Sequence, residues 1–305
     1  MYFRTFFFCG LLATLLFCGV YVAWFNASEA NQGMYFAIPA DQKHFEWCIN
    51  LIGSIYKHNF NEVKEVAVFN LGFTPDQLAY LKTIEKVTVH EIEKTNPYMF
   101  DLFKIREGED RVARGWYSWK PVVIKQALDM FPYVLYLDSG VTIYGSLSNV
   151  FKHIRDQGYF LFDSVTNIKK ITTQYVAQKL CMNDPRNQCI LNKIAVTAGI
   201  QGLSRALYKD YVLPVYELTK DIRNFQDDGT APGGFGWGRC DLTLYSIYAH
   251  YLNLHIFRFL TSPGRGELIV DNQKISMRLI DILNFTRENI NLSEHLKYIQ
   301  FKKIA

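Results

Sequence analysis

The sequence predicts an α/β protein with a doubly wound, mostly parallel sheet and flanking helices, preceded by one N-terminal transmembrane helix. Three observations lead to this prediction. Short apolar runs alternate with stretches of helical periodicity, an order that is typical of parallel sheets. One of these runs, residues 133–137, is apolar throughout, as expected of a strand that is buried on both faces. An uncharged segment, residues 5–28, precedes all of them.

The strands and helices follow from local patterns, taken in chain order. Apolar runs of strand length occur at residues 34–38, 65–69, 87–92, 133–137 and 159–162. Helical stretches are expected between them at residues 45–55, 74–81, 121–131 and 147–154. In the first helix Trp47, Leu51 and Ile55 share one face. The second begins at Thr74, a capping residue, and the third at Pro121, whose missing N–H costs nothing in a first turn.

The composition excludes several classes of protein. The chain has 305 residues, of which 49% are hydrophobic and 20% charged, and its net charge is +4. A mainly disordered chain would be less hydrophobic and more charged. Basic and acidic residues are interleaved, whereas a nucleic-acid-binding protein would carry a basic stripe. We therefore expect no nucleic-acid partner.

The uncharged segment predicts a membrane anchor. About 20 apolar residues in a helix match the hydrocarbon thickness of a bilayer, and residues 5–25 fit this length. Arg4 precedes the run and Glu29 follows it, so the positive-inside rule places residues 1–4 in the cytoplasm and the rest of the chain in the lumen. Residues 26–33 would form a short stem. The prediction is a single-pass type II protein of the Golgi or endoplasmic reticulum membrane.

A cleaved signal peptide is the alternative to the anchor. Ser28 and Ala30 are small residues at the −3 and −1 positions of a cleavage site after Ala30, and cleavage there would make the protein secreted. The sequons at Asn284 and Asn291 predict N-glycosylation in the same compartment.

The cysteines that follow the apolar segment also fit an oxidising compartment. They number four, which suits two disulfide bonds: Cys48, Cys181, Cys189 and Cys240. We expect Cys181 to pair with Cys189 across a turn-rich loop, and Cys48 to pair with Cys240. Four buried thiols are the alternative.

The most informative motif is the end of the run at residues 133–137. Asp138 follows it directly, and ligands of doubly wound sheets bind beyond the carboxyl ends of the strands. A carboxylate there suits a divalent cation, and Gly140 would let a ligand approach the backbone. Lys120, beside a predicted helix N-terminus, suits a phosphate group. The alternatives are an Asp that only caps a turn, a solvated Lys, and Trp119 packed in the core.

Three segments together resemble a known family. Residues 117–121 (YSWKP), 134–140 (VLYLDSG) and 147–151 (LSNVF) are similar to the core of GT-A fold glycosyltransferases, in the nucleotide-diphospho-sugar transferase superfamily. The resemblance implies a GT-A-like catalytic domain at residues 34–265 and a C-terminal extension at residues 266–305. It also implies a nucleotide-sugar donor and a glycan or glycoprotein acceptor.

The same resemblance assigns the donor side of the site. Trp119, Lys120, Asp138 and Gly140 would bind the donor, and Asp138 would hold Mn²⁺ or another divalent cation. The family's Asp-x-Asp element normally ends in a metal-binding Asp, and Gly140 occupies that position here. This departure leaves the dependence on a metal open.

The acceptor side rests on two further segments. Gly199, in residues 197–203, resembles the strand that lines the acceptor site in the family. Asp241 follows a glycine-rich loop and would bind acceptor hydroxyls or act as the general base, with Asp228 as a second candidate for the base. Trp237, in the same loop, would stack on a sugar ring. Each residue also has a purely structural alternative. These are a bulged strand for Gly199, a helix cap for Asp241, a turn for Asp228 and core packing for Trp237.

The sequence thus predicts a glycosyltransferase of the secretory pathway. A catalytically inactive carbohydrate-binding or scaffold protein of the same fold is the first alternative, because Gly140 replaces an expected ligand. A secreted α/β hydrolase is the second, although no nucleophile–His pair is evident in the sequence.

Overall fold

The computed structural model describes residues 33–105, 112–258, 265–270, 273–278 and 282–303. The chain divides into two units, residues 1–34 and 35–305, and the second holds nearly all of the described residues. The predicted cytoplasmic tail, membrane anchor and cleavage site lie outside the described residues, as does all of the stem except its last residue. Within the described ranges, no helix combines the length and the apolar character that crossing a membrane requires.

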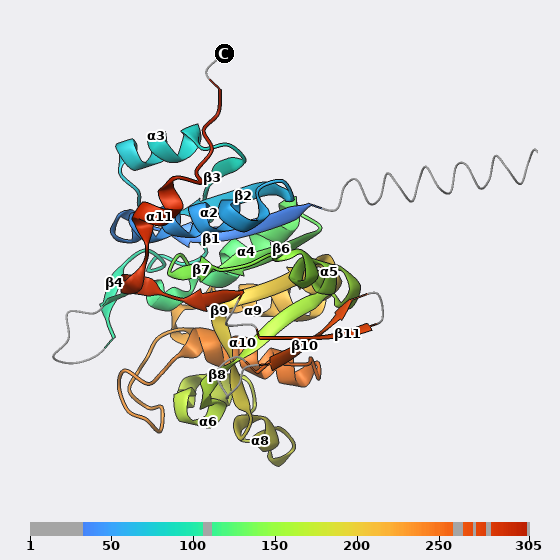
Figure 1. The fold of residues 1–305 in the computed structure, drawn as a ribbon. Helices are drawn as coiled ribbons and strands as arrows, with labels where there is room; N and C mark the ends of the chain where they lie inside the picture. Colours follow the sequence, from blue (N-terminus) through green and yellow to red (C-terminus); the bar gives the residue numbers. More distant parts are fainter. Residues whose placement is uncertain (1–32, 106–111, 259–264, 271–272, 279–281, 304–305) are drawn as a thin grey trace, which may run out of the picture. The chain divides into compact units, whose positions relative to one another are not determined.

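A six-stranded sheet forms the centre of the unit (Figure 1). Its strands are β1 (Met34–Ala40), β2 (Val63–Asn70), β3 (Val87–Glu91), β6 (Tyr133–Leu137), β8 (Tyr159–Asn167) and β9 (Ile194–Ser204). Their order is β3-β2-β1-β6-β9-β8. The pairs β2–β3 and β1–β6 are parallel, whereas β9 is antiparallel to both of its neighbours. The predicted mostly parallel α/β sheet is confirmed, with β9 as the exception.

Helices cover both faces of this sheet. The longer ones are α2 (Phe45–Asn59), α3 (Pro75–Thr83), α4 (Trp119–Met130), α5 (Ser148–Gln157) and α10 (Cys240–Tyr251). Ala37 of β1 belongs to a core cluster with residues of α4 and α10, whereas the adjacent Phe36 packs edge-on against Phe151 of α5. Because successive strand residues face opposite sides, α4 and α10 lie on one face of the sheet and α5 lies on the other.

The remaining elements are short. The helices are η1 (Gln42–His44), η2 (Gly115–Tyr117), α6 (Ile168–Ile171), α7 (Gln174–Lys179), α8 (Pro185–Leu191), η3 (Arg205–Leu207), η4 (Tyr208–Val212), α9 (Leu213–Leu218), η5 (Ile222–Asn224), η7 (Arg287–Asn289) and α11 (Leu292–Leu296). The strands are β4 (Leu102–Lys104), β5 (Val112–Arg114), β7 (Val141–Ile143), β10 (Arg265–Val270), β11 (Gln273–Arg278) and β12 (Leu283–Phe285).

The C-terminal segment packs onto the sheet unit. Strand β12 pairs antiparallel with β7, which follows β6. Helix α11 packs on α2, where His295 Nδ1 lies 2.7 Å from Asn50 Oδ1 in a buried contact. The predicted boundary at residue 265 is the first residue of β10. Strand β12 therefore lies against the short strand that follows Asp138, and α11 lies against α2.

The chain path creates a switch point between β1 and β6. The chain runs from β1 to β2 and β3 on one side, and then returns to β6 on the other side of β1. Ligands of open α/β sheets bind at such a point, beyond the carboxyl ends of the strands. Asp41 follows β1 there and Asp138 follows β6. The topology therefore predicts a ligand-binding site at this edge of the sheet.

Neither predicted disulfide is formed, because all four cysteines in the described ranges are free thiols. Cys240 lies in the core cluster that contains α4 and α10, and Cys48 is buried in α2 outside that cluster. The Sγ atom of Cys240 is directed to the carbonyl of Gln226, at 3.6 Å. Cys181 and Cys189 are exposed, so the alternative of four buried thiols does not describe the structure either.

The two predicted glycosylation sites lie in different settings. Asn291 is exposed and caps α11. Asn284 is half-buried in β12, opposite Thr142 of β7. Glycosylation of both remains a prediction, with the more accessible side chain at Asn291.

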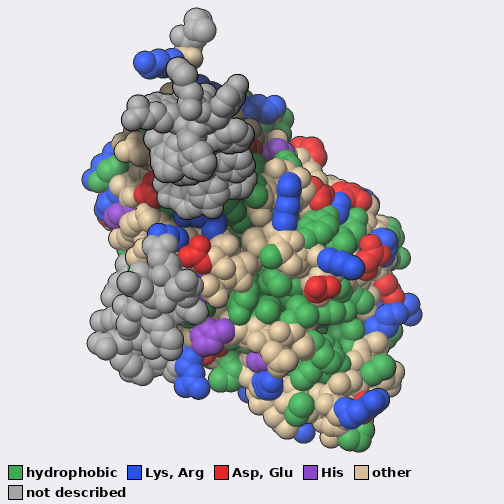
Figure 2. Space-filling view, turned by 90° about the vertical axis from the view of Figure 1, so that its right-hand side faces the viewer, with side chains coloured by type: hydrophobic (Ala, Val, Ile, Leu, Met, Phe, Trp, Pro, Cys, Tyr) green, Lys and Arg blue, Asp and Glu red, His purple; other side chains and the backbone are tan. Residues whose placement is uncertain are grey.

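The surface has mixed charge on the face that Figure 2 shows. Basic and acidic side chains are interspersed there, and hydrophobic side chains gather near the centre of the view. The interleaving of charges along the sequence is therefore also visible in space on this face.

Candidate active site

Three charged side chains meet at the carboxyl edge of β6. The Nζ atom of Lys120 lies 3.0 Å from Asp138 Oδ2 and 3.4 Å from Asp241 Oδ2. The Lys120 and Asp241 side chains are 5% and 1% exposed, whereas that of Asp138 is 31% exposed. We call these residues the Lys120 cluster. It contains two carboxylates and one ammonium group, and only Asp138 presents a substantial surface to solvent.

Asp138 is fixed by the strand that it ends. The hydroxyl of Tyr136 donates to Asp138 Oδ1 at 2.7 Å, and the Asp138 N–H donates to the carbonyl of Gly199 at 2.8 Å. Tyr136 is fully buried. Burial raises the pKa of Tyr136 well above its usual value, and the Asp138 carboxylate raises it further. The phenol therefore stays a hydrogen-bond donor and holds Asp138 in one orientation.

Lys120 is positioned by an unusual turn before α4. Gly115, Trp116 and Tyr117 all have positive φ, at 50°, 49° and 65°. Residues other than glycine rarely adopt this backbone conformation. A Cβ on Gly115 would lie 1.9 Å from the carbonyl oxygen of Met99, so only glycine fits there. Such local strain is concentrated at functional sites. Here it immediately precedes α4, whose second residue, Lys120, contacts Asp138.

The two carboxylates determine the protonation of Lys120. Burial favours the neutral amine, but Asp138 and Asp241 outweigh burial, and the pKa of Lys120 is raised above its usual value. The ammonium also lies 5.1 Å from the centroid of the Tyr117 ring. Lys120 is therefore a permanent cation, and the cluster as a whole carries one net negative charge.

Asp241 retains hydrogen-bonding capacity. It lies in the first turn of α10, where a carboxylate interacts favourably with the helix dipole. Among the described residues, no group donates a hydrogen bond to either carboxylate oxygen of Asp241, although both atoms are buried. Buried polar atoms normally have a partner. A buried carboxylate that is ion-paired but accepts no hydrogen bond, beside a partly exposed one, is the pattern of a site that a polar ligand completes.

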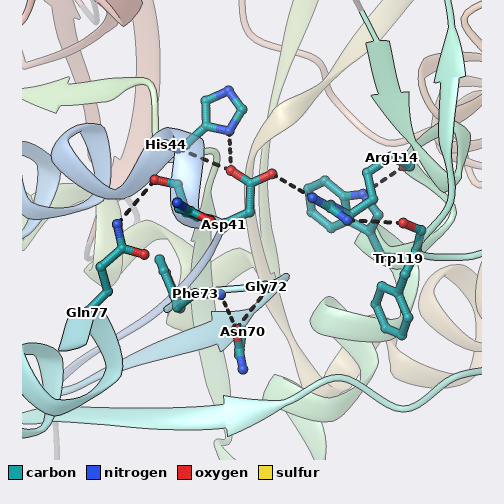
Figure 3. Close-up of polar contacts among 10 residues, drawn as sticks. Asp41, His44, Asn70, Gly72, Phe73, Gln77, Arg114 and Trp119 are labelled. Carbon is teal, nitrogen blue, oxygen red and sulfur yellow. Dashed lines mark hydrogen bonds and ion pairs between the residues drawn. The ribbon is translucent and has the colours of Figure 1, made fainter. Parts of the chain in front are cut away.

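A second network lies at the end of β1 (Figure 3). Asp41 Oδ1 accepts the backbone N–H of His44 at 3.1 Å, and Asp41 Oδ2 lies 3.1 Å from Arg114 Nη2. Arg114 Nη1 donates to the carbonyl of Phe100, and the indole of Trp119 donates to the carbonyl of Arg114. This network ties the end of β1 to the start of α4, so it connects Asp41 to the helix that carries Lys120.

The charge partners of Asp41 determine its pKa. Burial raises the pKa of this carboxyl group, but hydrogen bonds and charge from His44 and Arg114 together lower it to about 2. Asp41 is therefore ionised at neutral pH and neutralises Arg114. The ion pair of Asp41 with Arg114 was not predicted from the sequence. Its only sequence signal was that Asp41 follows a predicted strand.

Gly199 and Gly140 both flank Asp138. A Cβ on Gly199 would lie 2.7 Å from Asp138 Oδ2 and 2.9 Å from Phe285 Cζ. A Cβ on Gly140 would lie 3.2 Å from Arg287 Cγ and 3.3 Å from Trp47 Cε3. At either position, a residue with a Cβ atom would require its neighbours to move. Phe285 and Arg287 of the C-terminal segment therefore border the site.

The residues present do not fit a divalent cation. Such an ion needs several oxygen ligands at about 2.0–2.6 Å. Both Asp138 oxygens already accept from Tyr136 and Lys120, and Gly140 offers no carboxylate. In the described part of the chain, no three His, Cys, Asp or Glu side chains converge to form a ligand set.

The other predicted acceptor residues lie in the glycine-rich loop. Asp228 is exposed and accepts from the backbone N–H of Thr230, 2.9 Å away, within its own turn. Trp237 is 36% exposed, and Lys170 Nζ lies 3.9 Å from the centroid of its ring. No described contact joins Asp228 or Trp237 to the Lys120 cluster. The structure thus brings together Lys120, Asp138, Gly199 and Asp241, and places Asp228 and Trp237 in the loop that precedes α10.

Asp227 organises that loop and was not predicted. It is 3% exposed, and its carboxylate accepts from the backbone N–H groups of Gly229, Gly236 and Gly238 at 2.6–3.0 Å. Three donors from separate parts of the loop fix its course before α10. Asp227 is therefore a positioning residue for Asp241. From the sequence, the adjacent Asp228 was selected as the candidate instead.

Comparisons with known proteins give low similarities. No protein-family model matches the chain, and no curated protein sequence matches it. Among solved structures, the chain is similar to the WbbM bifunctional glycosyltransferase, with a TM-score of 0.42 and 11% identity over 72% of this chain and 38% of that one. Core-mannan synthase A from Aspergillus fumigatus, in its Mn/GDP form, gives a TM-score of 0.44 and 12% identity over 71% and 69%.

A third similar structure is mouse xyloside xylosyltransferase 1. It gives a TM-score of 0.43 and 10% identity over 73% of this chain and 84% of that one. The chain spans about two fifths of the WbbM chain. Likeness at this level carries no argument about activity, so the proposal below depends on the geometry of the site.

Proposed function

We propose that the chain is a glycosyltransferase that moves a sugar from a nucleotide-diphosphate sugar to a glycan or glycoprotein acceptor. The observation that carries the proposal is the Lys120 cluster. At the switch point of the sheet, a buried ammonium lies 3.0 Å from a partly exposed carboxylate and 3.4 Å from a buried one, which accepts no hydrogen bond from the described residues. The resemblance of residues 117–121 and 134–140 to GT-A glycosyltransferases supports the same function.

The cluster suits a sugar better than a phosphate. Its net charge is one negative, which would repel a diphosphate but favours hydroxyl groups that donate hydrogen bonds. Asp138 and Asp241 would accept from sugar hydroxyls, and Lys120 would donate to a sugar oxygen. Asp241 gains most from such a ligand, because leaving a buried carboxylate without donors costs free energy.

The reaction places demands on the surrounding groups. In sugar transfer, the bond from the anomeric carbon to the diphosphate oxygen breaks, and a bond to the acceptor oxygen forms. The acceptor hydroxyl loses its proton to a base, for which Asp241 is the candidate with unfilled hydrogen-bonding capacity. The leaving diphosphate gains negative charge, which fixed positive groups must stabilise.

The helix N-termini supply part of this positive potential. In the described structure, neither α4 nor α10 has a side-chain hydrogen bond to cap its N-terminus. Lys120 and Asp241 lie in the first turns of these helices, so both N-termini adjoin the cluster. Free N–H groups at a helix start interact favourably with anions.

Binding and turnover by the full-length chain, purified in mild detergent, test the proposal. Thermal unfolding is measured with a panel of nucleotide sugars, and release of nucleoside diphosphate is followed with oligosaccharide acceptors. A ligand at 100 times its Kd stabilises the folded state by about 2.7 kcal/mol. We expect one donor to stabilise the protein and to be turned over, and Asp241→Asn to reduce turnover at least 100-fold.

Two results would contradict the proposal in different ways. Donor binding without any sugar transfer would indicate the inactive carbohydrate-binding protein. The absence of any nucleotide-dependent shift in a folded sample would exclude the donor site itself.

We also propose that the protein works in the secretory pathway as a type II membrane protein. The support is the uncharged segment at residues 5–25, the positive residue before it and the two sequons. Expression in animal cells tests this. We expect a peptide-N-glycosidase to increase gel mobility, and Asn291→Gln to remove part of that change. A protein that stays in the soluble cytosolic fraction would contradict this proposal.

A further inference from the structure

The position expected to carry a second metal-binding carboxylate is closed by an arginine. The space next to Gly140, where a side chain would begin, is bordered by Arg287 Cγ at 3.2 Å and Trp47 Cε3 at 3.3 Å. These are already tight contacts for a Cβ atom, and a carboxylate would extend further. An Asp at position 140 could therefore be accommodated only if the Arg287 side chain moved away.

The backbone holds Arg287 at this place. The N–H groups of Thr286 and Arg287 both donate to the carbonyl of Gly140, at 2.9 and 3.0 Å. Phe285 is paired with Val141 in the short sheet of β12 and β7. The Thr286 hydroxyl lies 2.6 Å from that of Thr142. The stem of Arg287 is thus anchored to the residues that follow Asp138 and is not part of a free tail.

The Arg287 side chain borders the residues that flank Asp138, because its Cγ atom is 3.2 Å from the Cβ position of Gly140. Its Cζ atom is 5.8 Å from the centroid of the Phe285 ring. The edge of that ring and Asp138 Oδ2 approach the same point above Gly199, at 2.9 and 2.7 Å. Phe285 thus reaches the point where Asp138 Oδ2 borders Gly199, and Arg287 follows Phe285 two residues later in the chain.

The guanidinium of Arg287 is available to bind an anion. Its side chain is exposed, and among the described residues no carboxylate lies within ion-pair distance of it. Lys120, in contrast, is shared by two carboxylates. A diphosphate that reaches Gly140 would meet the Arg287 guanidinium, which no carboxylate among the described residues neutralises.

We propose that Arg287 takes the place of the divalent cation: its guanidinium binds the diphosphate of the donor, and donor binding needs no metal ion. This inference rests on the proposed function. Guanidinium groups form paired, charge-assisted hydrogen bonds to phosphate oxygens. The Lys120 cluster would then recognise the sugar, and Arg287 the diphosphate.

Calorimetric titration of the full-length chain in detergent tests the proposal. The probes are UDP, GDP and inorganic pyrophosphate, each in EDTA and each in excess Mn²⁺. The variants are Arg287→Gln, Arg287→Lys and the matched control Arg155→Gln. Arg155 also places its guanidinium over an aromatic ring, 5.6 Å from the centroid of Tyr133, but at the start of β6, the opposite edge of the sheet.

We expect at least one probe to bind in EDTA with an affinity that Mn²⁺ changes less than threefold. Arg287→Gln should weaken this binding about 10- to 100-fold, the usual effect of losing charged hydrogen bonds. Arg287→Lys should restore part of the affinity, and Arg155→Gln should bind like the unaltered chain. Equal thermal unfolding of the two Gln variants would show that folding is not the cause.

Three results would overturn the proposal. Binding that requires Mn²⁺ would show that a metal ion is needed, and the proposed function would survive. Equal affinity of Arg287→Gln and the unaltered chain in EDTA would assign the phosphate to another group. No binding of any probe in either condition would remove the donor site, and the proposed function with it.

Discussion

The contact between Lys120 Nζ and Asp241 Oδ2, at 3.4 Å, joins the first turns of α4 and α10, and the same ammonium contacts the partly exposed carboxylate of Asp138. Both side chains are almost completely buried. This contact links two segments that are far apart in sequence. It also makes the stability of the fold depend on the residues that we assign to the substrate.

Lys120→Met should destabilise the protein by about 3–5 kcal/mol, because it leaves Asp241 buried without its cation. The matched control is Lys125→Met on the same helix, whose partner Asp129 is 41% exposed. Loss of that surface pair should cost less than about 1 kcal/mol. Urea unfolding measures both changes. Equal losses in the two variants would contradict the assignment of Lys120 to a buried cluster.

The double variant Lys120→Met with Asp241→Asn should recover part of that loss. Removing both charges eliminates the unpaired buried carboxylate, so the two changes should not be additive. The coupling free energy from a double-mutant cycle is the measurement. A value near zero would mean that the two groups do not interact in solution.

Gly199→Ala should reduce both stability and ligand binding. The added Cβ would lie 2.7 Å from Asp138 Oδ2, which Tyr136 and Lys120 hold in place. The matched control is Gly202→Ala in the same strand, whose Cβ would meet Ile154 Cδ1 at 2.5 Å. We expect each to cost about 1–3 kcal/mol from overpacking. Only Gly199→Ala should also weaken binding of the ligand that the unaltered chain binds; equal affinities would contradict the site.

Asp41→Asn should destabilise the protein at pH 7 by about 2 kcal/mol. The pKa of Asp41 is lowered from 3.8 to about 2 in the folded state. The unfolded state therefore binds the proton more readily, and the stabilisation is complete above pH 4. It is lost as the pH falls from about 4 to 2. Urea unfolding of both proteins between pH 7 and 3 should show a constant difference that narrows only below pH 4.

The cysteines should divide into two classes of reactivity. Burial raises the pKa of the Cys48 thiol to about 12 and raises that of Cys240 as well, which leaves little thiolate for alkylation. Cys181 and Cys189 are exposed thiols. We expect iodoacetamide, added without reductant and followed by peptide mass spectrometry, to label Cys181 and Cys189 first. A peptide pair that is linked by Cys48 and Cys240 would contradict the structure.

Local patterns predicted most of the fold. The strand at residues 133–137 has the same bounds in the structure, because an uninterrupted apolar run suits only a strand buried on both faces. Thr74 caps α3 with the full reciprocal capping box of Thr74 and Gln77. The direction of β9 was not evident, because parallel and antiparallel strands have similar residue patterns when both faces are buried.

The candidate site was predictable only in part. Lys120, Asp138 and Asp241 were named because each follows a strand or begins a helix. Tyr136 could have been added, since residues two apart in a strand face the same side. Asp41, Arg114 and Arg287 could not have been assigned, because their partners depend on which strands are neighbours. The pairing of Cys48 with Cys240 was expected from the cysteine count alone, which contains no information on distance.

The sequence by itself determined which residues are apolar and with what period. This was enough to specify the strands and helices, and to place Asp138 after a strand and Lys120 at the start of a helix. A hydrophobic period involves only residues that are close in the chain, so it can be read from a single sequence. Only the tertiary structure decided that Asp241 shares the ammonium of Lys120 and that Arg287 closes the space beside Gly140. These contacts join segments that are distant in the chain, and their geometry depends on the order of the strands and on the packing of the C-terminal segment.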